Sequence, residues 1–241
     1  MDKKIVSVVI VTFNAEKTLQ NCLDSIYKQD TDSIEIILID GASQDGTIEI
    51  LQQNDSKISF WKSERDNGIY DAMNKALTHL STDHVIFLGA DDQLLPDFSK
   101  MLTTLTDPDV IYYANVLYKG KPHSGFIKPY YQAKLGIFHQ SIIYPVSIFK
   151  KYNYNLKYKI AADYALNMQL FKDSKYSFQY KDFLIADYSD TGISGIIKDE
   201  AFENDKSKLI LQNFGFKIWA RYLFRLLKSK LKPDKQWTRQ Q

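Results

Sequence analysis

The sequence contains a single cysteine, Cys22, among 241 residues. This excludes a disulfide within the chain and a cysteine-based zinc site, and it is typical of a cytosolic protein. No run of about 18 apolar residues occurs, so the sequence predicts no membrane-spanning helix. The apolar stretch at 5–11 is short and β-branched. It therefore favours a core strand over a signal peptide.

The chain also has no strong excess of positive or negative charge, because its 31 basic and 29 acidic residues give a net charge of +2. General nucleic-acid-binding proteins usually carry a strongly basic surface, so we expect no nucleic-acid partner. Hydrophobic residues make up 44% of the chain and charged residues 25%. These values are ordinary for a globular protein with a sizeable buried core.

Two glycine-rich phosphate-binding motifs are absent after the first predicted strand. Residues 12–17 read TFNAEK and contain no glycine. A dinucleotide-binding fold needs Gly-x-Gly-x-x-Gly at this place, and the Walker phosphate loop is equally glycine-rich. A receiver domain would explain Asp40 as a phosphoacceptor at a strand end. It leaves the acidic pair at 91–92 and the long C-terminal half unexplained.

Buried strands alternate with helices along the first ninety residues. Strands are predicted at 5–12, 34–39, 58–61 and 84–88. Helices are predicted between them at 15–29, 48–53 and 69–80, the first with Asn14 as its capping residue. This alternation predicts an α/β fold, in which helices cover both faces of a mostly parallel, Rossmann-like sheet.

The alternation weakens after Pro96. One or two strands are predicted at 110–118, a loop at 120–131 and a helix at 161–171. The tail at 214–231 has the spacing of an amphipathic helix rich in Lys and Arg. Such a helix suits the headgroup layer of an anionic membrane, and we expect peripheral membrane contact through it. The alternative is a helix packed on the domain with a solvated basic face.

Polar residues follow each of the four predicted strands, where parallel sheets bind ligands. They include Asn14, Asp40, Asp66 and the pair at 91–92. Carboxylates gathered at one edge raise each other's pKa, and a divalent cation removes that conflict. Oxygen ligands suit Mg²⁺ or Mn²⁺, which would bridge a pyrophosphate and stabilise a leaving diphosphate. The alternative for the pair at 91–92 is a cap for a helix near Pro96.

Four motifs in order resemble family 2 glycosyltransferases of the GT-A fold, and most of all the bacterial members that build surface polysaccharide. The resemblance covers about residues 5–195. It rests on a Thr-x-Asn turn within 6–14, an Asp-Asp-Gly-Ser-x-Asp-Gly-Thr signature at 39–47, a Glu-x-Asn-x-Gly stretch with an Ala-x-Asn helix at 64–74, and an Asp-x-Asp metal motif at 89–92. The last motif departs from the pattern, because Gly89 stands where the first Asp usually falls.

The resemblance implies an inverting, metal-dependent hexosyltransferase. Its donor would be a nucleoside-diphosphate sugar, with a UDP-sugar favoured, and its acceptor a hydroxyl of a glycan or lipid-linked oligosaccharide. It implies a GT-A domain at 1–205, with a nucleotide-sugar-binding half at 1–115, an acceptor-side half at 116–205 and a basic helical tail at 206–241. The expected location is the cytoplasm, at the cytoplasmic face of the inner membrane if the tail binds lipid.

Two alternatives stay open. A sugar-nucleotide pyrophosphorylase shares this architecture but needs a glycine-rich loop with Arg and Lys after the first strand. A non-catalytic nucleotide-sugar-binding module would not need both Asp91 and Asp163.

The resemblance also implies roles for single residues. Asp40 and Asp66 would hold the nucleoside, Asp91 the Mn²⁺ or Mg²⁺, and Asp163 would be the catalytic base. The implied donor contacts are Thr12, Phe13, Asn14, Asp40, Gly41, Glu64, Asp66, Gly68, Asn74, Ala90, Asp91 and His139.

Three of these segments have a plainer alternative. Asp163 falls at the place of the family's base at the start of a helix, and such a base is worth about 10²–10⁴ in rate, but Asp163 could instead cap that helix. His139, in a His-Gln pair, would contact the diphosphate or the metal, and the alternative is a core histidine. Residues 191–194 resemble a flexible Gly-Ile-Ser loop that closes over the donor, and the alternative is a plain turn.

Overall fold

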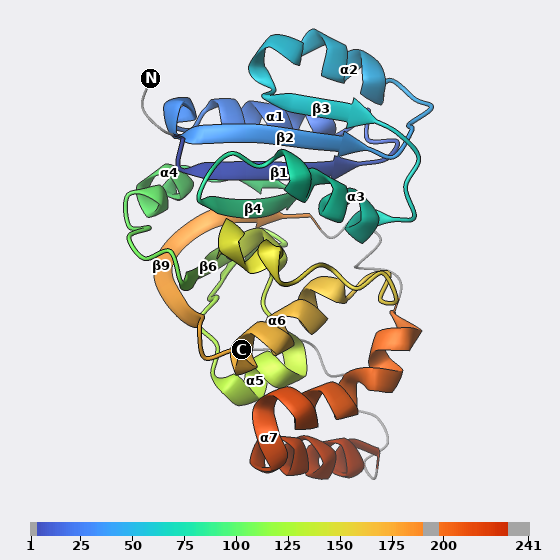
Figure 1. The fold of residues 1–241 in the computed structure, drawn as a ribbon, viewed down its shortest axis with the longest axis vertical. Helices are drawn as coiled ribbons and strands as arrows, with labels where there is room; N and C mark the ends of the chain where they lie inside the picture. Colours follow the sequence, from blue (N-terminus) through green and yellow to red (C-terminus); the bar gives the residue numbers. More distant parts are fainter. Residues whose placement is uncertain (1–3, 190–197, 231–241) are drawn as a thin grey trace.

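The computed structural model describes residues 4–189 and 198–230, and one mixed sheet runs through its upper half (Figure 1). The strand order is β3-β2-β1-β4-β8-β6-β9-β5, with β7 paired to β6. The first four strands are β1 (Val6–Thr12), β2 (Ile34–Asp40), β3 (Phe60–Ser63) and β4 (His84–Gly89). All pairs among these four are parallel, as the alternation predicted.

Both faces of this parallel part are covered because its side chains alternate. Val8 and Ile10 enter one core cluster and Val9 enters the other. The first cluster is closed by α1 (Leu19–Tyr27), whose buried residues recur at three- and four-residue spacing. The second is closed by α3 (Ile69–Ala76). Two further short helices are α2 (Thr47–Gln53) and α4 (Asp97–Leu102).

The second half of the chain extends the sheet mainly by antiparallel pairing. Its strands are β5 (Gln93–Leu94), β6 (Val110–Tyr118), β7 (Lys121–His123), β8 (Ile142–Pro145) and β9 (Ser177–Tyr188). The segment at 110–118 is thus one strand, and it pairs in parallel with β9 across two register shifts. The strongly curved β9 lets its last residues pair with β5 (Figure 1).

Three helices form the lower end of the molecule in Figure 1. They are α5 (Pro129–Leu135), α6 (Ala162–Lys172) and α7 (Glu200–Lys230). The predicted helical tail belongs to α7, which is interrupted at Gly215, where φ is 79°. The predicted boundary between 205 and 206 falls inside α7. None of the described helices is both long enough and apolar enough to span a membrane.

Two predictions from the sequence are wrong. The first helix begins at Leu19 and not at 15, and Asn14 does not cap it. Asn14 has a positive φ of 52°, and its side-chain oxygen accepts a hydrogen bond from the backbone N–H of Gln44. The second error is the predicted loop at 120–131, which contains β7 and the start of α5. A proline at the first helical position suits α5, because that position needs no N–H donor.

Candidate active site

The carboxyl ends of β1, β2 and β3 meet at one corner, and Asp40 lies at its centre. The carboxylate of Asp40 accepts hydrogen bonds from the N–H and hydroxyl of Ser43 and from the hydroxyl of Ser63. Asp40 is fully buried. These contacts fix the turn after β2. The predicted contact of Asp40 with the nucleoside stays a prediction.

Gly41, Asp66 and Phe13 converge at this corner. A Cβ atom on Gly41 would lie 2.7 Å from Asp66 Oδ2 and 3.3 Å from Phe13 Cδ2. A Cβ atom here would therefore force the carboxylate of Asp66 to shift. The ring of Phe13 is 64% exposed, which leaves it free to contact a ligand. Thr12, at the end of β1, has a buried hydroxyl without a hydrogen-bond partner among the described residues.

Asp66 also organises the start of α3. Its Oδ1 accepts a hydrogen bond of 2.8 Å from the N–H of Gly68. Gly68 has a φ of 111°, a conformation that favours glycine, and it immediately precedes α3. Asp66 thus joins the corner at Gly41 to the first turn of this helix.

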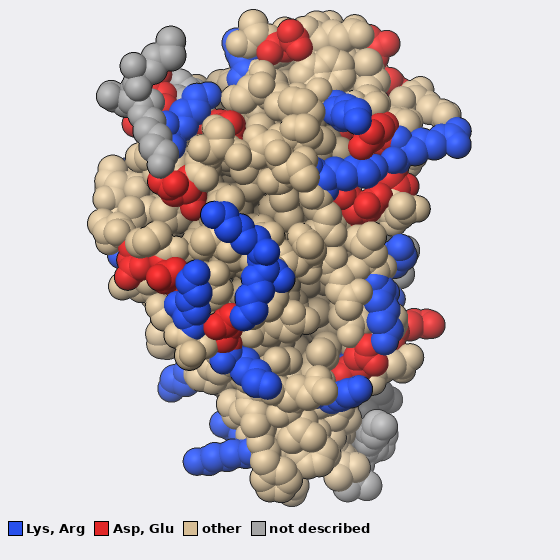
Figure 2. All heavy atoms as spheres, in the orientation of Figure 1, with Lys and Arg blue, Asp and Glu red and all other residues tan. Residues whose placement is uncertain are grey.

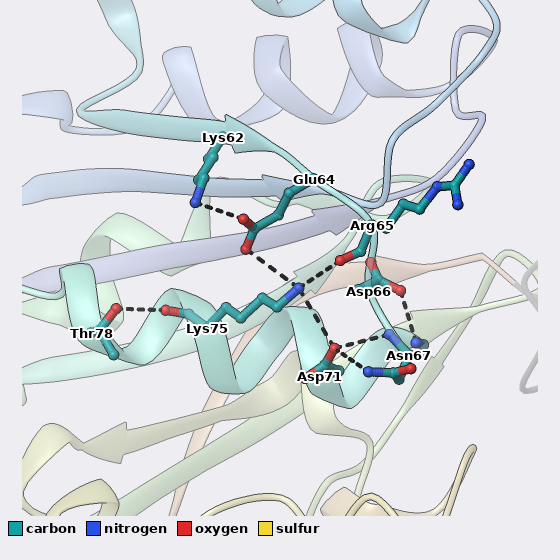
Figure 3. Close-up of polar contacts among 9 residues, drawn as sticks. Lys62, Glu64, Arg65, Asp66, Asn67, Asp71, Lys75 and Thr78 are labelled. Carbon is teal, nitrogen blue, oxygen red and sulfur yellow. Dashed lines mark hydrogen bonds and ion pairs between the residues drawn. The ribbon is translucent and has the colours of Figure 1, made fainter.

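Glu64 belongs to an ion-pair cluster beside this corner (Figure 3). It contacts Lys62 at 2.6 Å and Lys75 at 3.3 Å, and Lys75 also contacts Asp71 at 3.6 Å. The hydrogen bond from Lys62 is the main reason that the pKa of Glu64 is lowered. Both carboxylate oxygens of Glu64 thus face lysines. The predicted contact of Glu64 with the donor stays a prediction.

The predicted metal motif forms a tight turn after β4. Asp92 is buried, and its carboxylate accepts hydrogen bonds from the N–H groups of Gly89 and Ser189 and from the side-chain amide of Gln140. Burial raises the pKa of Asp92 to about 6, although these donors and His139 oppose the shift. Helix α4 has no side-chain cap, so the capping alternative for this pair is wrong.

His139 links this turn to the predicted catalytic base. Its Nδ1 lies 3.7 Å from Asp163 Oδ2, and the next residue, Gln140, donates to Asp92 Oδ2 at 2.9 Å. His139 and Asp163 are both largely buried, with 24% and 14% of their side chains exposed. The structure therefore brings the predicted base next to the acidic turn, although 71 residues separate Asp163 from Asp92 in the sequence.

Two other predicted donor contacts, Asn74 and Ala90, make contacts within the protein. Both ends of the Asn74 amide are hydrogen-bonded to the backbone of Tyr154, which supports a structural role for Asn74. Ala90 is buried in the core. The predicted loop at 191–194 lies outside the described residues.

Two residues of the site were missed by the sequence analysis. The hydroxyl of Tyr70 lies 2.6 Å from Asp163 Oδ1, and the carboxylate of Asp199 accepts the N–H groups of Ile160 and Ala161. Tyr70 carried no signal beyond a place on the buried face of its helix. Its partner is 93 residues away.

The acidic turn is suited to a divalent cation, but protein side chains alone do not enclose one. Within residues 4–189 and 198–230 no three His, Cys, Asp or Glu side chains form a group that could hold a metal. Asp91 supplies hard oxygen atoms at this turn, whereas both oxygens of Asp92 already accept hydrogen bonds from the protein. Mg²⁺ commonly binds through one or two carboxylates together with substrate phosphates. The donor set therefore fits a metal that arrives with a diphosphate.

Comparison with known proteins agrees with this geometry. The sequence profile described as "Glycosyl transferase family 2" matches residues 7–176. A "PGL/p-HBAD biosynthesis glycosyltransferase" of Mycobacterium tuberculosis is 29% identical over 208 residues, which cover 81% of each chain. An uncharacterized glycosyltransferase of Methanocaldococcus jannaschii is 32% identical over 184 residues, which cover 68% of this chain and 63% of the relative.

Solved structures share the fold at low sequence identity. TarS of S. aureus, residues 1–349 in complex with UDP-GlcNAc, superposes with a TM-score of 0.71 and 18% identity, covering 93% of this chain and 73% of that one. The mannosyltransferase PcManGT of Pyrobaculum calidifontis, in complex with GDP-Man and Mn²⁺, gives a TM-score of 0.62 at 18% identity, covering 88% and 64%. The chain belongs to glycosyl transferase family 2, has the GT-A fold and is a nucleotide-sugar glycosyltransferase.

Proposed function

We propose that the chain is an inverting, divalent-metal-dependent hexosyltransferase that transfers a sugar from a nucleoside-diphosphate donor to a glycan or lipid-linked hydroxyl. One observation carries the proposal. The segment at 139–140 contacts Asp163 with its first residue and the acidic turn, through Asp92, with its second. A base and a diphosphate-binding turn side by side are what transfer with inversion requires.

The nucleoside would bind at the corner formed by Gly41, Asp66 and Phe13. The exposed ring of Phe13 can pack on a base, and Asp66 can accept hydrogen bonds from the base or ribose. Asp40 would act indirectly, by holding the turn that carries Gly41. UDP is the favoured nucleotide, because TarS was solved with UDP and UDP-GlcNAc, whereas PcManGT was solved with GDP-Man.

Asp91 would hold Mn²⁺ or Mg²⁺ together with oxygen atoms of the donor diphosphate. The metal would supply positive charge at the diphosphate oxygens as the sugar leaves. PcManGT was solved with Mn²⁺, which supports a divalent metal here. His139, beside Asp163, would contact the diphosphate or the metal.

Asp163 would take the proton of the acceptor hydroxyl. As that proton moves to the carboxylate, the hydroxyl oxygen forms a bond to the anomeric carbon on the face opposite the diphosphate. The bond from the anomeric carbon to the diphosphate breaks, and its electron pair leaves with the diphosphate. The configuration at the anomeric carbon is therefore inverted. Asp163 is not the N-cap of α6, because it is the second residue of that helix.

The acceptor side would comprise 116–205, and the helical tail after it would bring the enzyme to a membrane that carries the acceptor. In Figure 2, the lowest part of the molecule, where the later turns of α7 lie, shows uncharged and basic surface, and the acidic atoms lie further up. This setting suits surface-polysaccharide synthesis at the cytoplasmic face of the inner membrane.

A panel of nucleotide sugars tests the proposal. Thermal unfolding with UDP-glucose, UDP-galactose, UDP-GlcNAc and GDP-mannose, each with Mn²⁺, would show which donor raises the melting temperature. Release of the nucleoside diphosphate from that donor, with and without EDTA, would show catalysis. Binding without release would favour a non-catalytic module. Formation of a nucleoside triphosphate from donor and pyrophosphate would favour a pyrophosphorylase.

A further inference from the structure

The segment that carries Asp163 is held from two sides. Helix α3 contributes the hydroxyl of Tyr70, which lies 2.6 Å from Asp163 Oδ1 and 2.8 Å from the carbonyl oxygen of Ile160. The chain before α7 contributes Asp199, whose Oδ2 accepts the N–H of Ile160 at 2.8 Å and of Ala161 at 3.2 Å. The backbone before Asp163 and one oxygen of its carboxylate are therefore fixed together.

Tyr70 is itself placed firmly. It is 6% exposed, and its ring packs against Tyr154 with 5.2 Å between centroids. Asn74, one turn further along α3, holds the backbone of Tyr154 through two hydrogen bonds. Burial, and then the charge of Asp163, raise the pKa of Tyr70 well above its ordinary value. The hydroxyl therefore keeps its single proton and donates it to Oδ1 of Asp163, the nearer and charged acceptor, and not to the carbonyl oxygen of Ile160.

The two oxygens of Asp163 lie in different surroundings. Oδ1 faces the Tyr70 hydroxyl, whereas Oδ2 lies 3.7 Å from Nδ1 of His139, on the side of the acidic turn. The hydrogen bond from Tyr70 to Oδ1 restricts the rotation of the Asp163 carboxylate. The oxygen that faces the acidic turn is consequently held in one place.

We propose that Tyr70 is a positioning residue, which ties down Oδ1 of Asp163 so that Oδ2 receives the proton of the acceptor. This inference rests on the proposed role of Asp163 as the base. Tyr70 does not touch the reacting atoms. It also lies two residues after Gly68, which Asp66 holds, so the donor corner and the base depend on the same first turn of α3.

The test compares Tyr70→Phe with the matched control Tyr144→Phe. Tyr144 is also fully buried and its hydroxyl makes a single hydrogen bond, to Asn167 at 2.9 Å. Release of UDP from the active UDP-sugar of the panel, with Mn²⁺, gives kcat and KM for each variant. Misplacing a catalytic group by about 1 Å can cost about 100-fold in rate. We expect Tyr70→Phe to lower kcat between about 10-fold and 100-fold, with donor KM unchanged within about twofold, and Tyr144→Phe to keep both values.

A double-mutant cycle separates positioning from general stabilisation. In the Asp163→Asn background the base is gone, so adding Tyr70→Phe should slow the residual rate by no more than about twofold. An equal loss in both backgrounds would overturn the inference, as would a wild-type kcat in Tyr70→Phe alone. If Asp163→Asn itself keeps the wild-type rate, the proposed base is wrong, and that result is distinct from a failure of Tyr70 alone.

Discussion

Gly41 lies close to two side chains of the donor corner. A Cβ atom there would collide with the carboxylate of Asp66 and press on the ring of Phe13. Because Asp66 also holds Gly68 at the start of α3, a displaced Asp66 would disturb the whole corner. Gly41 does not have a positive φ, so a glycine suits this position because it leaves space for the neighbouring side chains.

We therefore predict that Gly41→Ala weakens UDP binding about tenfold, measured by calorimetry with Mn²⁺. Asp66→Ala should weaken it to a similar extent. Because both changes act on one contact, the double variant should be no weaker than the worse single variant. Additive losses would show that Gly41 acts on the nucleotide by another route.

Asp92 makes the stability of the metal-free protein depend on pH. Burial raises its pKa from 3.8 to about 6 in the folded state, so the folded protein holds this proton more tightly than the unfolded chain. The contribution of Asp92 to stability is therefore highest below about pH 4 and falls as the pH rises to about 6. This rise in the pKa of Asp92 corresponds to at most about 3 kcal/mol of unfolding free energy.

Asp92→Asn, which is neutral at every pH, should remove this dependence. In urea unfolding with EDTA, we expect wild type to lose up to about 3 kcal/mol relative to the variant between pH 4 and pH 7. Asp97→Asn is a control of opposite sign, because a hydrogen bond from Lys100 lowers the pKa of Asp97. Wild type should gain stability over that variant as the pH rises. A constant difference for Asp92→Asn would contradict the prediction.

At this scale the sequence identified the acidic residues but not their surroundings. Asp91, Asp163 and His139 were singled out because each lies in a short motif with a fixed place relative to a strand or helix, and their roles stay predictions. The burial of Asp40 could not be predicted, since it depends on hydroxyl donors from two separate segments. Tyr70 could not be predicted either, because no local spacing relates it to Asp163.

Among the elements, α7 after Gly215 presents three different faces. Ile218, Trp219 and Tyr222 pack against the core, and Arg221 stacks on the ring of Tyr130 at 3.9 Å. An apolar stripe of Phe216, Phe224 and Leu227 stays 71%, 65% and 62% exposed. An exposed basic stripe runs beside it and consists of Lys217, Arg225 and Lys228.

The two stripes together suit an anionic membrane surface. Residues 216–230 contain no Asp or Glu. Each exposed Phe or Leu buried in the acyl boundary is worth about 1.5–3 kcal/mol, and each basic residue near anionic headgroups about 1 kcal/mol. One face of this helix thus packs on the domain, and membrane contact through the other two stays a prediction.

Flotation with vesicles containing phosphatidylglycerol tests this proposal. We predict that replacing Phe216, Phe224 and Leu227 together by Ser lowers the bound fraction at least tenfold, because the apolar contribution is lost. Leu211→Ser is the matched control, since Leu211 is 40% exposed on α7 but precedes the break at Gly215. Unchanged flotation of the triple variant would contradict membrane contact. So would a change in oligomeric state as its main effect, which would indicate a second copy of the chain as the partner.

The elements that the sequence missed are those whose formation depends on distant partners. Strand β7 has only three residues and exists because β6 offers it an edge. Helix α1 begins later than predicted. Asn14 has a positive φ, and its side chain accepts a hydrogen bond from Gln44 in the loop after β2 and does not cap the helix. Longer buried elements, such as β1 and α6, were predicted within a few residues.

For the molecule as a whole, the parallel half was predictable and the later half was not. Buried strands and amphipathic helices in alternation allow few arrangements, because crossovers between parallel strands are right-handed and adjacent. The later strands pair antiparallel or across register shifts, and β9 joins β6 with β5 by curving. No sequence period encodes such pairings. This second half nevertheless supplies His139 and Asp163, the diphosphate contact and the base of the proposed site.

The central claim is that the acidic turn and Asp163 divide the work, with the turn holding the donor diphosphate and Asp163 activating the acceptor. Asp91→Ala should therefore weaken the binding of UDP with Mn²⁺ about tenfold or more and also abolish transfer, because it removes the metal ligand. Asp163→Asn should affect only the chemical step.

The most direct measurement is therefore turnover and calorimetric binding of UDP with Mn²⁺ on the same preparation of Asp163→Asn. We predict that turnover falls by about 10²–10⁴, the worth of a general base, while the affinity for UDP stays within about twofold of wild type. Wild-type turnover in this variant, or an equal loss of binding and turnover, would contradict the account.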